Sequence, residues 1–377
     1  MTLPGLTSEQ VLLADSARRF LERESGNAAS ASGAAATSSE AERWRAMADM
    51  GWLGVGLPED AGGSGGPVET MMLMEAFGRA LDASGFLSSV VLAGRLVARL
   101  AQEDQRNDLL RPLIAGSHRY AFAAAEGPRN ALHEIATTAT PNTGGYVLRG
   151  RKPVVLDACE ADTLIVLART RGATEDREGL SLFRVPARAS GLELRAYRTY
   201  DGRSAADLVL TDVGVDDGAR LGEEGAAWSA VEWAVDHALV ALCAEALGAM
   251  AGAHDLTLDY LKTRKQFGRA IGSFQVLQHR MVDVHVAMEE SRSLVLAASI
   301  DLSRSQPVRR RTVAAAKIFV GRSAKLVAEE CVQMHGGIGI ADEYRIGHYF
   351  KRLLAIDTLF GDADHHAGSF PLAEPAG

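Results

Sequence analysis

A dense group of ionisable residues lies near the C-terminus, in the segment LFGDADHH from Leu359 to His366. Asp362, Asp364 and the two histidines could bind a metal ion, act as an acid–base pair, or cap and solvate a chain end. Adjacent histidines at a chain end rarely reach one ion together, and no distant ligand cluster accompanies them. The sequence therefore predicts no metal site, and it leaves open a capping, surface or interface role and a proton-transfer role for Asp362.

A second candidate site is the segment RKQFGRAIGSFQ, from Arg264 to Gln275, which connects two predicted helices. Arg264 supplies a fork of donors that suits a pyrophosphate, and Gln266 adds a neutral donor. Phe267 offers an apolar face, and Gly268 lets the backbone turn. The alternative is a plain connection between helices with a charged turn.

The segment QMHGGIG, from Gln333 to Gly339, is a third candidate. Its paired glycines, Gly336 and Gly337, allow the backbone to approach a ligand closely. The alternative is a helix C-cap, which needs only one of them. Each motif alone is a weak signal, but their order, spacing and helical setting together are much more specific.

The composition is that of an ordinary globular chain. Its 377 residues exceed one compact core and predict two or three domains. Hydrophobic residues make up 47% and charged residues 23%, and the net charge of -8 without a long basic run argues against nucleic-acid binding. Cys159, Cys243 and Cys331 are widely spaced and lack a CxxC pattern, which suits a reducing compartment.

No secretory or membrane segment is expected. The N-terminal stretch MTLPGLTSEQVLLADSARRF lacks a basic start followed by an apolar core, so it predicts no signal peptide. The most apolar stretch, HALVALCAEALGAMAGAH, is rich in alanine and interrupted by Glu245, which favours a buried helix over a membrane span. We therefore expect a cytoplasmic protein.

The hydrophobic periodicity predicts a first, helical segment over residues 1 to about 118. Ser8 is the expected N-cap of its first helix, and further helices are expected from about Glu69 and Glu103. The stretch SGNAASASGAAATSSE, rich in small residues, predicts a loose loop between them.

The periodicity changes twice further along the chain. From about 119 to 223, short β-branched runs separated by turns predict antiparallel strands in a barrel or sandwich. From about 224 to 377, apolar residues recur every three or four positions, which predicts long helices in a bundle. One helix, from about Trp228 to Lys262, is apolar on most faces and is expected at the bundle centre or in a subunit interface.

Four stretches together resemble the acyl-CoA dehydrogenase family, in particular its divergent actinobacterial-type members, some of which are heterotetramers. They are MADMGWLGVGLPEDAGGSGG, GYVLRGRKPVVLDACEADTLIVLA, YLKTRKQFGRAIGSFQVLQHRMVDV and CVQMHGGIGIADEYRIGHYFKRL. The resemblance covers nearly the whole chain. It implies an α+β fold with an N-terminal α-helical domain (1–118), a middle antiparallel β-barrel-like domain (119–223) and a C-terminal four-helix bundle (224–377).

The resemblance also implies FAD as cofactor, an acyl-CoA substrate, an electron-transfer flavoprotein or similar acceptor, and a tetramer. It places six residues of the two C-terminal motifs against the FAD of a neighbouring subunit: Arg264, Gln266, Phe267, Gln333, Gly336 and Gly337.

The half of the flavin site that the middle domain contributes departs from the family pattern. The family's threonine-containing loop is here the shorter AAEGPRN, with Ala125 at the threonine position and no clear serine for the pyrophosphate. The family's tryptophan beside the flavin ring is Val154, and its hydroxyl residue at flavin N5 is Leu156. Four ligand-binding side chains of the family are therefore missing together.

The catalytic base of the family is also missing from its usual places. Gly361 stands at the glutamate position, and Asp362, one residue later with a shorter reach, is the substitute that we consider. A second branch of the family carries its base on the central helix, where this chain has Ala238 followed by Leu239. Asp236 matches a position that contacts the CoA arm in some relatives, although it could equally be a plain surface residue.

Three functions remain open from the sequence. The chain could be a self-sufficient FAD-dependent acyl-CoA dehydrogenase that uses Asp362 or another base, on a steroid or other bulky acyl chain. It could be the non-catalytic subunit of an α2β2 enzyme that completes the FAD site of its partner. It could also be a flavin-dependent oxidase or monooxygenase, because this fold hosts such activities.

Overall fold

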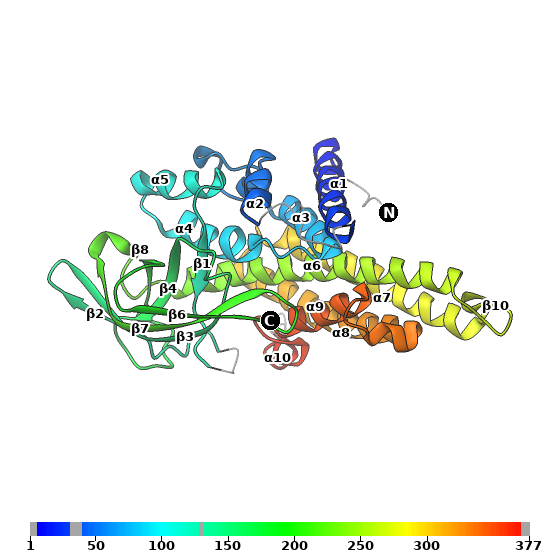
Figure 1. Cartoon of the computed structure of the whole chain (residues 1–377). Coiled ribbons are helices and arrows are strands. Elements are labelled where there is room, and N and C mark those ends of the chain that lie inside the picture. The colour runs from blue at the N-terminus through cyan, green and yellow to red at the C-terminus, as the bar shows by residue number, and fades with distance from the viewer. Residues whose placement is uncertain (1–5, 31–39, 128–130, 371–377) are drawn as a thin grey trace, which may run out of the picture. The chain divides into compact units, whose positions relative to one another are not determined.

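A computed structural model describes residues 6–30, 40–127 and 131–370 of the chain (Figure 1). Helices come first, strands follow from Tyr120, and long helices return at Trp228. This order confirms the α+β fold expected from the changes in hydrophobic periodicity.

The first helix, α1, spans Ser8–Ser30. Its cap is Thr7 rather than the expected Ser8: the Gln10 amide N–H donates to Thr7 Oγ1 (3.2 Å), and the Thr7 amide N–H donates to Gln10 Oε1 (3.0 Å). This is a reciprocal capping box, and it satisfies two amides of the first turn. The predicted loose loop was also wrong in part, because residues 25–30 are helical; residues 31–39 lie outside the described part of the chain.

Further helices of the N-terminal segment include α2 (Glu40–Asp49), α3 (Pro67–Ala80), a π-helical stretch (Leu87–Gly94), α4 (Arg95–Leu100) and α5 (Glu103–Ile114). The starts predicted near Glu69 and Glu103 are confirmed within two residues. The stretch from Leu87 was not predicted. Every residue of the π-helical stretch is buried, so it has no polar face to reveal a helical period.

The middle segment forms an eight-stranded sheet. Its strands are β1 (Tyr120–Ala123), β2 (Thr138–Asn142), β3 (Gly145–Leu156), β4 (Thr163–Arg169), β5 (Leu180–Pro186), β6 (Leu192–Arg198), β7 (Ser204–Asp216) and β8 (Arg220–Leu221). The order is β6-β7-β3-β2-β4-β5-β8, and β1 pairs with β4. Most pairs are antiparallel as predicted, but β1 and β2 pair parallel to β4. Alternate residues of β3, β4 and β7 form a buried apolar core.

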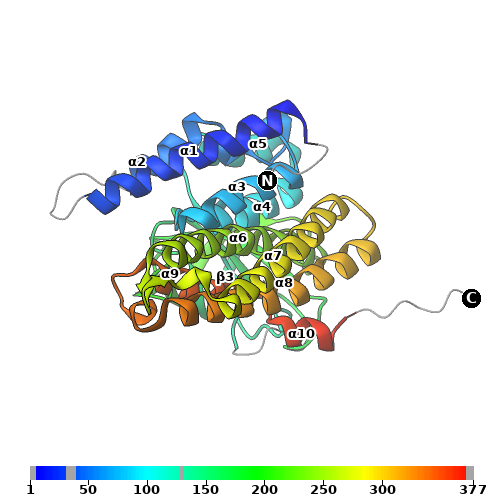
Figure 2. The ribbon, with the colours of Figure 1, turned by 90° about the vertical axis from the view of Figure 1, so that its right-hand side faces the viewer.

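The C-terminal helices are α6 (Trp228–Thr263), α7 (Gln275–Asp301), α8 (Gln306–His335), α9 (Arg345–Thr358) and α10 (Ala363–Gly368) (Figure 2). The predicted apolar seam of α8 is confirmed, because Val313, Val320, Val327 and Cys331 are all buried. Among the described helices, α6 is long and apolar enough to cross a membrane, but 89% of its most apolar window is buried.

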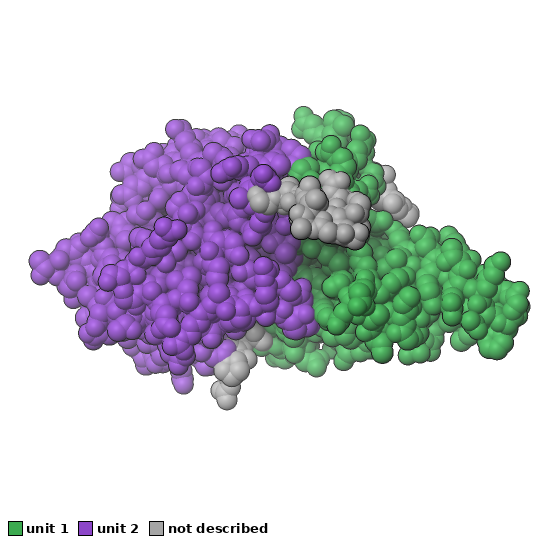
Figure 3. Space-filling view, viewed as in Figure 1, with its two compact units in different colours: residues 1–38, 67–82, 239–377 green, residues 39–66, 83–238 purple. Residues whose placement is uncertain are grey.

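The internal contacts divide the chain into two compact units (Figure 3). Unit 1 comprises residues 1–38, 67–82 and 239–377, and unit 2 comprises residues 39–66 and 83–238. The division falls inside α6 and does not follow the expected domain boundaries near residues 118 and 223, which stay predictions. Within unit 1, α3 and α6 pack backbone to backbone, because a Cβ on Gly248 would lie 1.8 Å from the carbonyl oxygen of Glu75.

Candidate functional site

The RKQFG motif forms a projecting hairpin in unit 1. Strands β9 (Lys265–Gln266) and β10 (Arg269–Ala270) are antiparallel, with only Phe267 and Gly268 between them. Both turn residues have positive φ, 52° and 78°, as a type I′ turn requires. Such a turn favours Asn-Gly, and a bulky residue at its first position costs about 1 kcal/mol. Phe267 is nevertheless 90% exposed, so neither turn geometry nor core packing explains an aromatic residue there.

The polar side chains of the two C-terminal motifs are exposed and available. Arg264, Gln266 and Gln333 are exposed, and within the described part of the chain no hydrogen bond or ion pair engages their side-chain donors. An unpaired guanidinium and two amides add little to the stability of a fold. They form a donor set suited to an anionic, phosphate-bearing ligand.

The glycines of the QMHGGIG motif have separate roles. Gly336 is the C-cap of α8, with φ of 65°, which accounts for this glycine by backbone geometry. The fold does not require a glycine at position 337, because its φ is not positive and a Cβ there would meet no heavy atom within 4 Å. The fold therefore leaves open space at Gly337, as close approach by a ligand would require.

His335 and Tyr260 bring the two motifs to the same end of unit 1. Tyr260 lies in the last turn of α6, just before Arg264, and its ring stacks on that of His335 with centroids 4.6 Å apart. His335 Nδ1 donates to the carbonyl oxygen of Cys331 (2.7 Å), which fixes the ring at the end of α8. His335 could not be identified from the sequence, because a histidine at a helix end has many ordinary explanations.

In unit 2, the residues at the flavin-side positions offer no donor side chain. Ala125 and Leu156 are half-buried, and Val154 is 52% exposed. Val154 has a φ of 52°, unusual for a β-branched residue, at a register shift in β3. Its amide N–H donates to Asp207 Oδ1 (3.0 Å), which holds this conformation. Pro128, Arg129 and Asn130 of the AAEGPRN loop lie outside the described residues.

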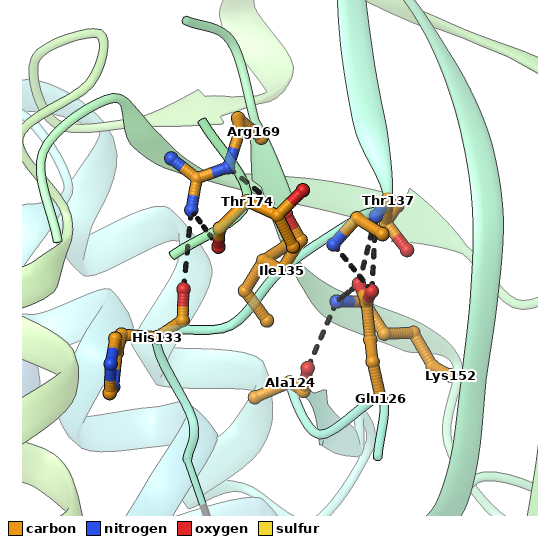
Figure 4. A network of polar contacts seen from close by, with 9 residues as sticks. Ala124, Glu126, His133, Ile135, Thr137, Lys152, Arg169 and Thr174 are labelled. Atoms are coloured by element: carbon orange, nitrogen blue, oxygen red, sulfur yellow. Dashed lines mark hydrogen bonds and ion pairs between the residues drawn. The ribbon is translucent and has the colours of Figure 1, made fainter. Parts of the chain in front are cut away.

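A buried ion pair fixes the start of that loop (Figure 4). Lys152, whose side chain is 0% exposed, donates to Glu126 Oε1 (2.5 Å) and to the carbonyl oxygen of Ala124 (2.9 Å). Glu126 also accepts from the amide of Ala136 (2.6 Å) and from that of Thr137 (3.0 Å). Burial lowers the pKa of Lys152 to about 8, opposed by Glu126. Burial would raise the pKa of Glu126, but Lys152 and the amide donors lower it overall. These polar groups are occupied in holding the fold.

Arg169 fixes the neighbouring loops in the same way. Its guanidinium donates only to backbone carbonyl oxygens, including those of Ile135 (3.0 Å), His133 (3.2 Å), Thr174 (2.8 Å) and Asp176 (2.8 Å). Figure 4 shows this second cluster beside the Glu126–Lys152 pair. Neither network could be predicted from the sequence, because nothing in a strand pattern marks which charged residues turn inward.

The C-terminal LFGDADHH segment is a capped turn. Asp362 is the N-cap of α10, and its Oδ1 accepts from the His365 amide N–H (2.8 Å). His366 Nε2 donates to the carbonyl oxygen of Phe360 (3.0 Å). The described residues contain no group of three or more side chains that could hold a metal ion. The geometry agrees with the capping alternative, and the role of Asp362 as a base stays a prediction.

The central helix carries a buried carboxylate, but it is already paired. Arg352 binds Glu245 through two parallel hydrogen bonds, Nε to Oε1 (2.8 Å) and Nη2 to Oε2 (2.7 Å). The two side chains are 5% and 0% exposed, so the pair belongs to the core of unit 1. Ala238 and Leu239, at the second base position of the family, are buried. Asp236 is only 8% exposed, so the surface alternative for it was wrong, while its contact with CoA stays a prediction.

The unit 1 half of the site therefore fits FAD, and the unit 2 half does not supply the hydroxyls that FAD binding in the family uses. When bound, FAD accepts the hydride removed from the substrate. In this chain Arg264, Gln266 and Gln333 would hold its anionic part, and Phe267 an apolar ring.

Comparisons with known proteins cover almost the whole chain. Sequence models of the acyl-CoA dehydrogenase N-terminal, middle and C-terminal domains match residues 7–117, 121–213 and 225–368. The probable acyl-CoA dehydrogenase YngJ of Bacillus subtilis is 29% identical over 316 residues, covering 81% of this chain and 82% of YngJ. The caffeyl-CoA reductase–Etf complex subunit CarC of Acetobacterium woodii is 29% identical over 313 residues, with coverage of 81% and 82%.

A solved structure of a variant of the Tcur3481–Tcur3483 steroid ACAD is also similar, with a TM-score of 0.82, 29% identity and 96% coverage of each chain. The three matching domain models, the helical, sheet and helical segments, and the exposed donor set of the two C-terminal motifs agree with one another. The chain belongs to the acyl-CoA dehydrogenase family, whose members are FAD enzymes that dehydrogenate CoA thioesters.

Proposed function

We propose that this chain works in the FAD-dependent α,β-dehydrogenation of a CoA thioester by completing the flavin site of a neighbouring, catalytic subunit. The observation that carries this proposal is the inequality of its two half-sites. Unit 1 presents Arg264, Gln266 and Gln333 with unengaged donors among the described residues, and an exposed, strained Phe267. Unit 2 presents aliphatic side chains where the family uses hydroxyls and a tryptophan.

The missing base supports the same proposal. Removal of an α-proton from a thioester needs a positioned carboxylate, because the proton is very weakly acidic at neutral pH. The family's two base positions hold Gly361 and Ala238, and the nearby carboxylates Asp362 and Glu245 serve as a helix cap and a core ion-pair partner. The catalytic carboxylate would then come from the partner.

The relatives support a class of substrate and an electron acceptor. One similar structure is described as a steroid ACAD made of two proteins, which supports a bulky, steroid-like acyl-CoA and a heteromeric assembly. The relative CarC is named as a subunit of a complex with Etf, which supports an electron-transfer flavoprotein as acceptor. We place this activity in lipid or steroid catabolism in the cytoplasm, where three free cysteines are stable.

The flavin content of the purified protein tests the proposal. Expressed alone, the chain should bind FAD poorly and oxidise acyl-CoA little. Co-expressed with a paralogue that has the complete middle-domain motif and a glutamate base, it should form an α2β2 tetramer with two flavins rather than four. A homotetramer with four tightly bound FAD molecules and normal turnover would refute the proposal and establish the self-sufficient enzyme.

The self-sufficient enzyme is the second candidate, and one observation favours it. The turn at Val154 keeps its strained conformation and exposes residue 154, as a strand that lies against a ligand would. In this alternative Asp362 or another carboxylate acts as base, and Asp362→Ala should reduce turnover by orders of magnitude while bound flavin stays unchanged.

A further inference from the structure

The chain reverses direction where the family carries its base. Helix α9 ends at Thr358, and the next turn passes through Phe360 and Gly361 with positive φ angles of 56° and 101°. A Cβ on Gly361 would lie 2.4 Å from His365 Cδ2 and 3.0 Å from His366 Nε2. A side chain at position 361 is therefore opposed by the positive φ, and it would also require both imidazole rings to move.

One of the two rings and the backbone of the other histidine are held by hydrogen bonds within the segment. The carbonyl oxygen of Phe360 can only accept, so His366 Nε2 carries a proton and donates to it (3.0 Å). The backbone of His365 is fixed through its amide N–H, which donates to Asp362 Oδ1 (2.8 Å), while its exposed ring lies edge-on against that of His366, with centroids 5.2 Å apart. The two histidines and Asp362 thus cover Gly361 from the C-terminal side.

Helix α8 fixes the same segment from the other side. Lys317, which is 1% exposed, donates from Nζ to the carbonyl oxygens of Ile356 (2.5 Å) and Asp357 (2.9 Å), in the last turn of α9. One helical turn along α8, a Cβ on Gly321 would lie 2.2 Å from Asp357 Oδ1. Burial raises the pKa of Asp357, while Lys317 and a hydrogen bond from the Ala363 amide oppose this shift.

We propose that Lys317, Asp357 and the His365–His366 pair lock this segment and close the family's base position to any side chain. Lys317 and Asp357 act as positioning residues, because they touch the end of α9 and the start of α10. The inference deepens the proposed function and rests on it: the loss of the base is built into the surrounding residues and is not reversed by one substitution. It assigns a structural role to the ionisable residues of LFGDADHH.

Thermal unfolding of the purified full-length chain tests the closure. Gly361→Ala and Gly361→Glu should lower the midpoint, the latter by roughly 5 °C or more. Gly368→Ala is the matched control on α10, because a Cβ there meets nothing within 4 Å, and its midpoint should stay within about 1 °C. A Gly361→Glu variant with an unchanged midpoint would overturn the closure.

Hydrogen exchange tests the lock without depending on the folding of a glutamate variant. The amides of Ala363, His365 and His366 should be protected in the wild type. Lys317→Met should speed their exchange by about tenfold or more, because it leaves two carbonyl oxygens unpaired. Lys325→Met replaces an exposed lysine of the same helix, and it should leave the exchange rate of these amides unchanged. Immediate exchange in the wild type, or equal protection in both variants, would overturn the lock.

These measurements need neither flavin nor a partner. If the closure fails but the flavin ratio agrees with an α2β2 enzyme, the inference is wrong and the proposed function stands. If the closure holds and the chain alone forms a four-flavin, active homotetramer, the proposed function is wrong, and the base does not stand at position 361.

Discussion

Two strained residues with the same backbone φ make the clearest comparison in this molecule. Phe267 in unit 1 and Val154 in unit 2 both have φ of 52°, and they are 90% and 52% exposed. Phe267 carries an aromatic ring beside unengaged donors, whereas Val154 is an aliphatic residue beside Asp207 and Tyr197. The backbone shape at Val154 is held by the fold itself, through Asp207. A strained, exposed residue can therefore be maintained by a hydrogen bond within the fold, without a ligand.

The difference extends to the charged residues around each position. In unit 2, Lys152 and Glu126 pair with each other inside the fold. In unit 1, Arg264 is exposed and has no partner among the residues that the structure describes. A substitution of Lys152 or Glu126 should therefore affect folding, and a substitution of Arg264 should affect only the binding of a ligand.

The largest effect is expected from Lys152→Met. It leaves the Glu126 carboxylate without its cation in a buried site, which should destabilise unit 2 by about 3–5 kcal/mol. The matched control is Arg149→Ala, which breaks the exposed Arg149–Asp212 pair and should cost no more than about 1 kcal/mol. Denaturant unfolding of both variants measures the difference. Equal, small losses would show that the Glu126–Lys152 pair does not hold the loop.

The next effect should appear in binding alone. Arg264→Ala should weaken flavin retention in the assembled enzyme by about 1.5–3 kcal/mol, the contribution of a charge-assisted hydrogen bond. The thermal midpoint of the flavin-free chain should stay unchanged, because no described group pairs with this guanidinium. Arg311→Ala, on an exposed arginine of α8, is the control and should change neither quantity. Unchanged flavin content in the Arg264 variant would remove this residue from the site.

Hydrophobic periodicity was enough to predict the order of helices, strands and helices, and the apolar residues at every third or fourth position of α8 are buried. It did not reveal the buried π-helical stretch at Leu87–Gly94, because that stretch has no polar face. It also missed the parallel pairing of β1 and β2 with β4, because strand patterns do not encode partners. Motif spacing predicted the donor residues of unit 1. Inward-turned charges such as Lys152, Lys317 and Arg169 could not be predicted, because burial of a charge depends on partners far away in sequence.

A pH-dependent effect is expected at Asp157, which follows Leu156 in unit 2. Ser88 Oγ lies 2.5 Å from Asp157 Oδ2 and 3.0 Å from the Gly85 carbonyl oxygen, but it has one hydrogen to donate. Protonated Asp157 can donate to Ser88 Oγ while Ser88 donates to Gly85, whereas the ionised carboxylate can only accept from Ser88. Burial raises the pKa of Asp157 to about 6, opposed by the hydrogen bond from Ser88 to the carboxylate and by the charge of Arg203. The folded state thus binds this proton more tightly than the unfolded state.

The stability that Asp157 contributes is therefore present at low pH and lost as pH rises from about 4 to about 6. Asp157→Asn keeps a donor at every pH, so it should be more stable than the wild type by about 1–3 kcal/mol at pH 8 and not at pH 4. The measurement is the difference in unfolding free energy between the two proteins across this range. A difference that does not change with pH would place the proton elsewhere.

The smallest effect, and the sharpest separation of the two regions, is expected from Phe267→Asn. Asparagine adopts positive φ readily and suits the first position of a type I′ turn, so the flavin-free chain should gain about 0.5–1 kcal/mol of stability. The same variant should retain less flavin in the assembled enzyme, because it removes the exposed aromatic face. A gain in stability together with a loss of flavin would mean that Phe267 lowers the stability of the hairpin in favour of a contact outside its own fold.

Val154→Asn, at the matching strained position of unit 2, is the control. It should gain similar stability and leave the flavin content of the α2β2 enzyme unchanged. A loss of flavin in the Val154 variant equal to that in the Phe267 variant would show that both half-sites are in use, which is the result that the self-sufficient enzyme requires.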